Sequence, residues 1–411
     1  MKKEFNGVKL LMVVLCLCGV IFAADAGVMV KFEKGATSAA IPIKLFDNII
    51  YMQVRINDSE SLDFIYDTGA SMISCIDEEA AAGLKMKFGN KSNAGGAGEQ
   101  QVRTHKLDNV QVSLPGLHFS RVEISTLPFA SSHPFWGIKK QGLFGTNLIS
   151  RVITEIDYQA RKMTLYAPQA YQHVDSSEKI PFTPFGLSPF IKVKIEVQGK
   201  KEPIEALMLV DTGVRITNFN TPFVDKHGLI EKSEKTVENT TGYGIGGESV
   251  GVIGRVKTIR MGNIVLHDPV VDFSRDKKGA LASDMFNGII GADILSRFTV
   301  VFDYEKKIIA LKKNSTFDQP FEYDMSGIYP IADGPELNIF KIHRIVNDSP
   351  AETAGLKPGD IIAAIDGQDT TTMTLEQVKQ VLKSEPGRKL NLRISREGKI
   401  LQISLTLKRL I

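Results

Sequence analysis

The chain has 411 residues, a formal net charge of +3 and 43% hydrophobic residues. This length exceeds what a single hydrophobic core usually serves, so two or three domains are expected. Basic and acidic residues alternate without a long basic run, so nucleic acid is not an implied partner.

The first 26 residues carry the pattern of an export signal. Three lysines precede an apolar run over residues 10–23, and Ala24-Asp25-Ala26 is a small-x-small cleavage site. We expect a signal peptide over residues 1–26, a periplasmic or extracellular location, and no stable membrane insertion after cleavage. The alternative is an uncleaved signal that anchors the protein, although the run is short for a bilayer span of about 20 residues.

The chain has three cysteines, and two of them, Cys16 and Cys18, would leave with the signal. The mature chain would then hold only Cys75 and form no internal disulfide. We expect Cys75 to be a small buried residue rather than a nucleophile, since no histidine is near it in sequence.

The first predicted domain covers residues 40–168 and consists of short strand-like runs separated by Gly, Asn and Asp. Residues 51–56 and 62–66 predict a pair of strands, and residues 77–84 predict a short helix. Four prolines between residues 168 and 189 then mark a boundary.

The second predicted domain covers residues 188–313 and begins with residues 191–197. These alternate between apolar and polar side chains, which is typical of a half-buried strand. An apolar run then leads directly into Asp211.

Two motifs occur once in each of these domains. Asp-Thr-Gly stands at residues 67–69 and 211–213, and a glycine-bounded apolar segment follows at residues 142–149 and 288–295. The aspartates are 144 residues apart and the first glycines 146 residues apart. These nearly equal spacings indicate that a whole lobe is repeated.

The paired aspartates predict an acid pair. A glycine two residues after each aspartate lets another segment approach closely. If the lobes pack about a pseudo-twofold axis, Asp67 and Asp211 face each other, share a proton and titrate as a coupled pair. The ionised acid would take a proton from a bound water while the protonated acid polarises a substrate carbonyl.

The last domain, residues 322–411, carries the segment Ala354-Gly355-Leu356-Lys357-Pro358-Gly359-Asp360, a predicted helix over 375–382 and two final strands. It resembles a PDZ domain. The resemblance implies an extended C-terminal peptide as ligand. Its carboxylate would be held by a loop containing Ser326, Gly327 and Ile328, and Leu375 would contact an apolar ligand side chain.

The two lobes resemble the aspartic peptidases, in the form of retropepsin-like lobes joined in one chain and followed by a PDZ domain, as in exported bacterial proteins. The resemblance implies a mainly β fold: two acid-protease β-barrel lobes related by pseudo-twofold symmetry, then an α+β PDZ domain. It implies peptide or protein substrates, no cofactor and no metal. The implied catalytic residues are Asp67 and Asp211, supported by Thr68, Gly69, Thr212 and Gly213.

The same family closes glycine-rich hairpins, called flaps, over the substrate. Such segments occur at equivalent places in both lobes, and their glycine content suits a moving lid. Each segment taken alone could also be a simple turn. The predicted flap residues are Gly95, Gly96 and Gly98 in the first lobe and Tyr243, Gly244, Gly246 and Gly247 in the second.

The lobes differ after the triplet. The next residue is alanine in the first lobe and valine in the second, so no side-chain hydroxyl supports either carboxylate, and we expect activity near about pH 5 to 6. Arg215 and Asp293 are both charged, whereas their equivalents Ser71 and Asn147 are not. This matched change predicts a salt bridge between Arg215 and Asp293.

Other functions fit the sequence less well. A zinc peptidase would need His-Glu-x-x-His, which the chain lacks. A serine peptidase would need Gly-x-Ser-x-Gly at a strand-to-helix turn, and the one match, at residues 247–251, lies in the glycine-rich segment of the second predicted flap. The competing interpretation is a catalytically silent peptide-binding protein that uses the same clefts. As a peptidase, the chain is expected to keep most of its cleavage of short peptides without residues 322–411, which would select or regulate substrates without doing chemistry.

Overall fold

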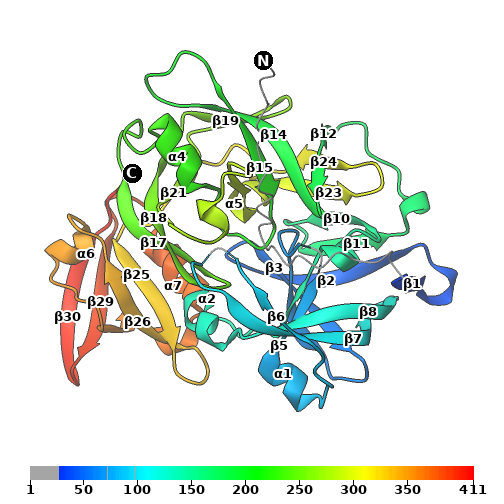
Figure 1. The fold of residues 1–411 in the computed structure, drawn as a ribbon. Helices are drawn as coiled ribbons and strands as arrows, with labels where there is room; N and C mark the ends of the chain where they lie inside the picture. The colour runs from blue at the N-terminus through cyan, green and yellow to red at the C-terminus, as the bar shows by residue number, and fades with distance from the viewer. Residues whose placement is uncertain (1–26, 72, 97) are drawn as a thin grey trace, which may run out of the picture.

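The computed structural model describes residues 27–411 apart from residues 72 and 97, so the predicted export signal lies outside the described residues. The chain folds into two β-rich lobes and a smaller C-terminal domain (Figure 1). Within the described part of the chain, no helix is long and apolar enough to cross a membrane.

The elements follow the chain order from one lobe to the next. The first lobe contains β1 (Met29–Phe32), β2 (Ser38–Phe46), β3 (Ile49–Ile56), β4 (Leu62–Tyr66), β5 (Ser74–Asp77), α1 (Glu78–Gly83), β6 (Lys91–Ala94), β7 (Val102–Leu114), β8 (Leu117–Leu127), α2 (His133–Trp136), β9 (Gly142–Phe144), α3 (Thr146–Ile149), β10 (Ile153–Asp157) and β11 (Lys162–Tyr166). The second lobe and the segment before it contain β12 (Glu178–Pro181), β13 (Thr183–Phe185), β14 (Ser188–Glu196), β15 (Ile204–Val210), β16 (Asn218–Phe219), α4 (Thr221–His227), β17 (Val237–Gly244), β18 (Gly247–Arg255), β19 (Thr258–Met261), β20 (Ile264–His267), β21 (Val270–Ser274), β22 (Gly288–Ile290), α5 (Ala292–Leu295), β23 (Phe298–Asp303) and β24 (Ile308–Lys313). The C-terminal domain contains β25 (Ile328–Asp333), β26 (Ile339–Ile345), α6 (Pro350–Thr353), β27 (Ile361–Ile365), β28 (Gln368–Asp369), α7 (Leu375–Leu382), β29 (Lys389–Arg396) and β30 (Lys399–Thr406).

The two lobes repeat one arrangement around their triplets. Asp67 directly follows β4, which pairs in parallel with β9, and Asp211 directly follows β15, which pairs in parallel with β22. The Asp67 amide donates to the Phe144 carbonyl (3.1 Å), and the Asp211 amide donates to the Ile290 carbonyl (3.0 Å). The glycine-bounded segments therefore hold both aspartate loops in the same way, as the pseudo-twofold relation predicts.

A sheet formed by both lobes joins them. β10 of the first lobe pairs antiparallel with β23 of the second, and the sheet runs in the order β12-β24-β23-β10-β11-β2. Ile156 and Phe302 on these two central strands are fully buried. Backbone hydrogen bonds as well as side-chain packing therefore fix the lobes relative to each other.

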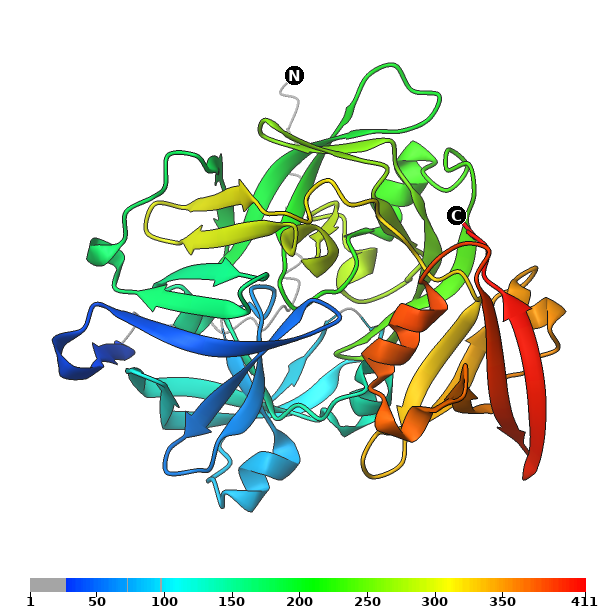
Figure 2. The ribbon, with the colours of Figure 1, turned by 180° about the vertical axis from the view of Figure 1, so that it is seen from behind.

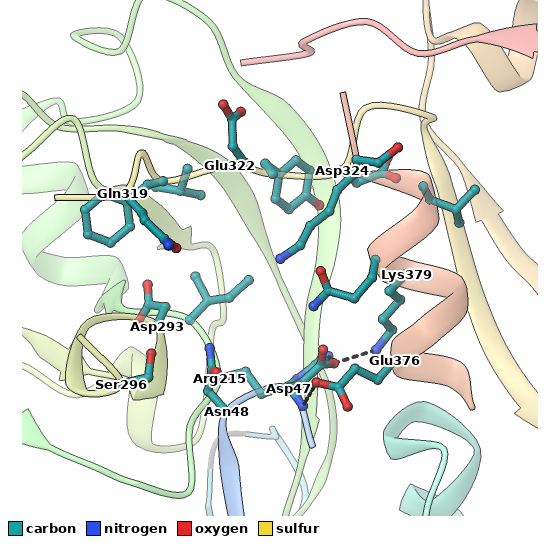
Figure 3. Close-up of a pocket in the computed structure, with 18 of the residues that line it drawn as sticks. Asp47, Asn48, Arg215, Asp293, Ser296, Gln319, Glu322, Asp324, Glu376 and Lys379 are labelled. Atoms are coloured by element: carbon teal, nitrogen blue, oxygen red, sulfur yellow. Dashed lines mark hydrogen bonds and ion pairs between the residues drawn. The ribbon is translucent and has the colours of Figure 1, made fainter. Parts of the chain in front are cut away.

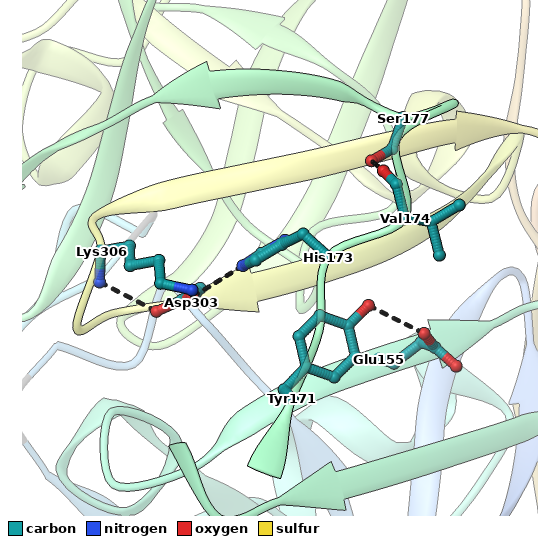
Figure 4. A network of polar contacts seen from close by, with 7 residues as sticks. All are labelled: Glu155, Tyr171, His173, Val174, Ser177, Asp303 and Lys306. Atoms are coloured by element: carbon teal, nitrogen blue, oxygen red, sulfur yellow. Dashed lines mark hydrogen bonds and ion pairs between the residues drawn. The ribbon is translucent and has the colours of Figure 1, made fainter. Parts of the chain in front are cut away.

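The proline-bearing segment between the lobes is not a plain linker, because β12 and β13 lie within it. Just before them, His173 Nε2 lies 2.8 Å from Oδ2 of the buried Asp303, and the Tyr171 hydroxyl donates to Glu155 (3.0 Å) (Figure 4). These contacts attach the segment to β10 and to the end of β23.

The C-terminal domain has a sheet in the order β25-β26-β27-β29-β30. Its helix α7 begins at Leu375 because Thr374 and Gln377 form a reciprocal capping box. Leu375, Val378 and Leu382 are buried on one face of the helix. α7 lies on the side of the domain that faces the two lobes (Figure 2).

Candidate active site

Asp67 and Asp211 meet at the interface of the lobes, where their carboxyl groups are hydrogen-bonded to each other. Each aspartate also packs against the glycine of the opposite triplet. A Cβ atom on Gly69 would overlap the Asp211 carboxyl group, and one on Gly213 would overlap that of Asp67. Glycine is therefore required at both positions by close approach across the interface.

The two carboxyl groups have unequal surroundings. Asp67 Oδ1 accepts hydrogen bonds from the amides of Gly69 (2.9 Å) and Ala70 (2.8 Å), whereas Asp211 Oδ1 accepts one from Gly213 (2.7 Å). Burial raises the pKa of both groups, and the negative charge of Asp67 raises the pKa of Asp211 further. The surroundings of Asp67 thus favour the ionised form more than those of Asp211 do.

The threonines of the triplets lock the two loops together. The Thr68 amide donates to Thr212 Oγ1 (3.2 Å), and the Thr212 amide donates to Thr68 Oγ1 (3.0 Å). Each hydroxyl then donates to a carbonyl of the opposite lobe, Val210 for Thr68 (2.8 Å) and Tyr66 for Thr212 (2.7 Å). Both threonines are fully buried, so these bonds restrict the loops away from solvent.

The predicted salt bridge between Arg215 and Asp293 is wrong. Asp293 Oδ1 accepts from the amide (3.0 Å) and the hydroxyl (2.8 Å) of Thr217, while Arg215 Nη1 donates to Asp47 (3.0 Å). The carboxylate of Asp293 accepts hydrogen bonds within its own lobe, whereas the Arg215 side chain extends out of the lobe to Asp47. Burial raises the pKa of Asp293 to about 6.

Both predicted flaps are hairpin tips that meet each other. The Gly98 amide donates to the Ile245 carbonyl (3.0 Å), and the Gln100 amide donates to the Gly246 carbonyl (3.1 Å). Gly246 and Gly247 have φ angles of +93° and +111°, which strongly favour glycine. The predicted residues lie at or beside these tips: Gly95, Gly96 and Gly98 after β6, and Tyr243, Gly244, Gly246 and Gly247 between and at the ends of β17 and β18.

Comparison with known families agrees with this geometry. Residues 52–148 and 193–294 each match the aspartyl protease family, and residues 341–396 match the PDZ domain. The two lobes belong to the aspartyl protease family. The C-terminal domain is a PDZ domain. The matched segments include both triplets and both glycine-bounded segments, so the family assignment covers the acid pair.

Two known proteins are also similar to this chain, one over a short segment and the other at low sequence identity. A carboxyl-terminal-processing protease from Synechocystis sp. is 37% identical over 87 residues, which are 21% of this chain and 20% of that protein. This chain thus spans about one fifth of that relative. The solved aspartic proteinase from Irpex lacteus aligns over 69% of this chain and 99% of its own, with 13% identity and a TM-score of 0.45. The family matches support a protease.

Lys140 acts electrostatically on Asp67 in the aspartyl protease lobes and was not predicted. It is only 5% exposed, and its Nζ lies 3.6 Å from the centre of the Trp136 ring. Burial lowers the pKa of Lys140 to about 7, against the opposing effect of Asp67, and the lysine in turn lowers the pKa of Asp67. The sequence offers no signal for this role, because lysines are seldom buried.

Trp136 and Phe135 of α2 contact the flap of the second lobe. The Trp136 indole N–H donates to the Tyr243 carbonyl (3.1 Å), and the Phe135 ring stacks on the Tyr243 ring at 4.4 Å between centres. Both aromatic residues therefore pack against a flap. Cys75, which was predicted to be buried, is 6% exposed.

The loop expected to hold a ligand carboxylate in the PDZ domain already holds one from its own chain. Ser326 Oγ and the Gly327 amide donate to Asp324, and the Ile328 amide donates to Ser326 Oγ (3.0 Å). Leu375 is fully buried and lies beside lobe one, since a Cβ atom on Gly137 would be 2.5 Å from its Cβ. In this arrangement the four predicted PDZ residues contact the protein itself, and their peptide-binding role stays a prediction.

Proposed function

We propose that the chain is an exported aspartic endopeptidase that hydrolyses peptide bonds with a water held between Asp67 and Asp211. One observation carries the proposal: two buried carboxyl groups from equivalent loops are hydrogen-bonded to each other beneath a pair of glycine-rich hairpins. The family matches support it, and the N-terminal signal pattern supports export.

The unequal carboxyl groups suggest which acid performs each step. Asp67, ionised, takes a proton from the water, whose oxygen attacks the peptide carbonyl carbon. Asp211, protonated, donates its proton to the carbonyl oxygen as the tetrahedral intermediate forms. Asp67, now protonated, then gives its proton to the amide nitrogen, and Asp211 takes a proton back from one hydroxyl of the intermediate. The C–N bond breaks, the carboxylic acid and the amine leave, and the pair regains its starting protonation. The closed flaps would exclude bulk water during these steps.

The pair is active only while it holds one proton. At low pH a second proton removes the base, and at high pH the loss of the last proton removes the acid, so the rate profile is bell-shaped. Since burial raises the pKa of both groups, both limbs move upward from ordinary aspartate values. We expect kcat/KM to be highest near about pH 5 to 6. A maximum near about pH 2 to 3 would contradict these raised pKa values.

We also propose that the PDZ domain takes peptide C-termini from substrates or partners, as its family suggests. Such a ligand would have to displace Asp324 from the loop and lobe one from Leu375. Peptides with an apolar C-terminus should therefore bind the full chain more weakly than a variant with Asp324→Asn. Equal binding to both would argue against this route of entry.

Substitution of each aspartate tests the proposal. Asp67→Asn and Asp211→Asn should each reduce hydrolysis of a mixed peptide library by at least about 100-fold, since each removes one acid–base partner. The exposed Asp58→Asn and Asp284→Asn serve as matched controls and should stay near wild type. Circular dichroism checks that all four variants fold. Full activity in either dyad variant, or no hydrolysis by the wild type, would favour the silent peptide-binding protein.

A further inference from the structure

Asp47 joins all three domains of the chain at one point. It lies in the tight turn between β2 and β3, and its Oδ2 accepts from Arg215 Nη1 of the second lobe and from Lys379 Nζ of α7, each at 3.0 Å (Figure 3). Its amide donates to Glu376 of the same helix at 3.0 Å. The three charged side chains of this junction, Asp47, Arg215 and Lys379, are only 18–22% exposed.

Arg215 connects this junction to the acid pair. It is the second residue after Gly213, and its carbonyl accepts from the Asp293 amide (3.0 Å), which fixes the backbone of the loop. Its side chain leaves the lobe and lies beside Tyr329 of β25 as well as Asp47. The loop that carries Asp211 is thus held from outside by lobe one and by the PDZ domain together.

The carboxylate of Asp47 depends on both cations. Burial alone would raise its pKa, but Lys379 and Arg215 outweigh burial and hold the pKa well below the ordinary value. Removal of one cation leaves a buried carboxylate with a single partner, and such a change commonly rearranges the remaining groups. The position of the Arg215 side chain should therefore respond to Lys379.

The PDZ domain faces this junction with β25 and α7, which form its predicted peptide-binding groove. α2 of lobe one packs against β25, Gly137 contacts Leu375, and the Phe135 ring meets His343 of β26 at 5.3 Å between centres. His343 Nε2 also lies 3.2 Å from Glu248 of the flap strand β18. The domain is docked along its groove, and it touches the flap as well as the Asp211 loop.

A cavity of about 910 Å³ lies beside the junction and is lined by Asp47, Arg215, Lys379 and the loop before β25. Figure 3 shows Lys379 and Glu376 reaching from α7 toward the turn at Asp47. The ion pair from Lys379 and the hydrogen bond to Glu376 therefore hold α7 against the turn at the edge of this cavity.

We propose that Asp47 is a positioning residue through which the docked PDZ domain holds the Asp211 loop, by way of Arg215, in its active arrangement. The proposal rests on the proposed peptidase function. It differs from the expectation from sequence that cleavage of short peptides stays largely intact without residues 322–411, since the domain then supports that cleavage as well.

The test uses the full chain and four variants. Lys379→Met removes the charge and keeps the apolar stem, Lys379→Arg keeps the charge, Asp47→Asn removes the carboxylate, and the exposed Lys389→Met is the matched control. Hydrogen exchange of residues 211–217 reports on the loop without any need for activity. Steady-state hydrolysis of a peptide too short to reach the PDZ domain gives kcat and KM.

We expect exchange in residues 211–217 to become faster in Lys379→Met and Asp47→Asn, with kcat about tenfold lower and KM changed less than about twofold. Lys379→Arg and Lys389→Met should behave like the wild type. The variant with both Asp47→Asn and Lys379→Met should lose no more than the worse single variant, because the two residues act through one contact.

Unchanged exchange in Lys379→Met would overturn the proposal, and so would an unchanged kcat together with a lowered melting temperature, which would mark the contact as structural. If the wild type hydrolyses no peptide while exchange still becomes faster in Lys379→Met, the peptidase function fails and the coupling of the PDZ domain to the loop stands.

Discussion

In the first lobe, the Ser74 hydroxyl donates to Asn147 and accepts from the amide of the adjacent glycine-bounded segment. In the second lobe, the Thr217 hydroxyl makes the same two contacts, but its acceptor is the carboxylate of Asp293. The relay of hydrogen bonds is the same in both lobes, and only one of them contains a buried charge.

The lobes also differ in what supports the aspartate loop. The first loop is held by its own amides and by contacts within the aspartyl protease core. In the second loop, Arg215 contacts Asp47 and lies beside Tyr329 of the PDZ domain, and the negative charge of Asp67 raises the pKa of Asp211 in addition to burial. An internal repeat can thus place two aspartates in equivalent positions while their different surroundings give them different pKa values.

The largest effect is expected from substitutions that fill the space between each triplet glycine and the opposite carboxyl group. Gly69→Ala and Gly213→Ala should each reduce kcat/KM by more than about 100-fold, because the added methyl group displaces the opposite carboxyl group. Peptide hydrolysis and thermal melting are the measurements. Gly83→Ala in α1 is the control, since a Cβ atom there meets nothing within 4 Å. Retained activity in either triplet variant would show that the carboxyl groups are farther apart than described.

The reciprocal hydrogen bonds of Thr68 and Thr212 allow a second comparison of the two lobes. Thr68→Val and Thr212→Val keep the shape of the side chain but leave an amide and a carbonyl without their hydroxyl partner. We expect each to lower the free energy of unfolding by about 2 to 4 kcal/mol. Urea unfolding of both single variants and of the double variant measures this. Losses that differ strongly between the lobes, or that add fully in the double variant, would contradict a reciprocal lock.

Asp293→Asn makes the second lobe resemble the first. The pKa of Asp293 is raised by burial, so its effect on stability is neutral below the ordinary value of 3.8 and increasingly unfavourable as pH rises through about 6. The variant should therefore be more stable than the wild type by about 1 to 2 kcal/mol at pH 8, and nearly equal to it at about pH 3. Denaturation at both pH values checks this, and a variant that is less stable at pH 8 would count against it.

Much of the site could be predicted because the repeat places equivalent residues at equal spacing. Asp67 and Asp211 each directly follow a strand, and both the triplets and the hairpin tips lie within the repeated lobes. The acid pair and the hairpin tips could therefore be inferred from motifs alone. The partner of Arg215 could not. Asp47 lies 168 residues away in another lobe, while Asp293 offered a nearer carboxylate in the equivalent motif.

The same limit applies to the PDZ domain. Its helix begins and ends where the pattern predicts, because Thr374 and the spacing of leucines are local signals. The domain docks against Gly137 and Asp47 of lobe one, and no sequence motif at either residue predicts that contact. Asp324 likewise appears as an ordinary loop residue until the fold turns its carboxylate onto the neighbouring amides.

The central claim is that two equivalent loops supply one ionised and one protonated acid. Titration of the aspartate carboxyl carbons by ¹³C NMR tests it most directly, with Asp67→Asn and Asp211→Asn used to assign the signals. The account predicts a coupled pair in which the first ionisation appears mainly at Asp67 and the second, at higher pH, mainly at Asp211. Independent titration of both carboxyl groups near the ordinary aspartate value of about 3.9, or ionisation of Asp211 first, would contradict it.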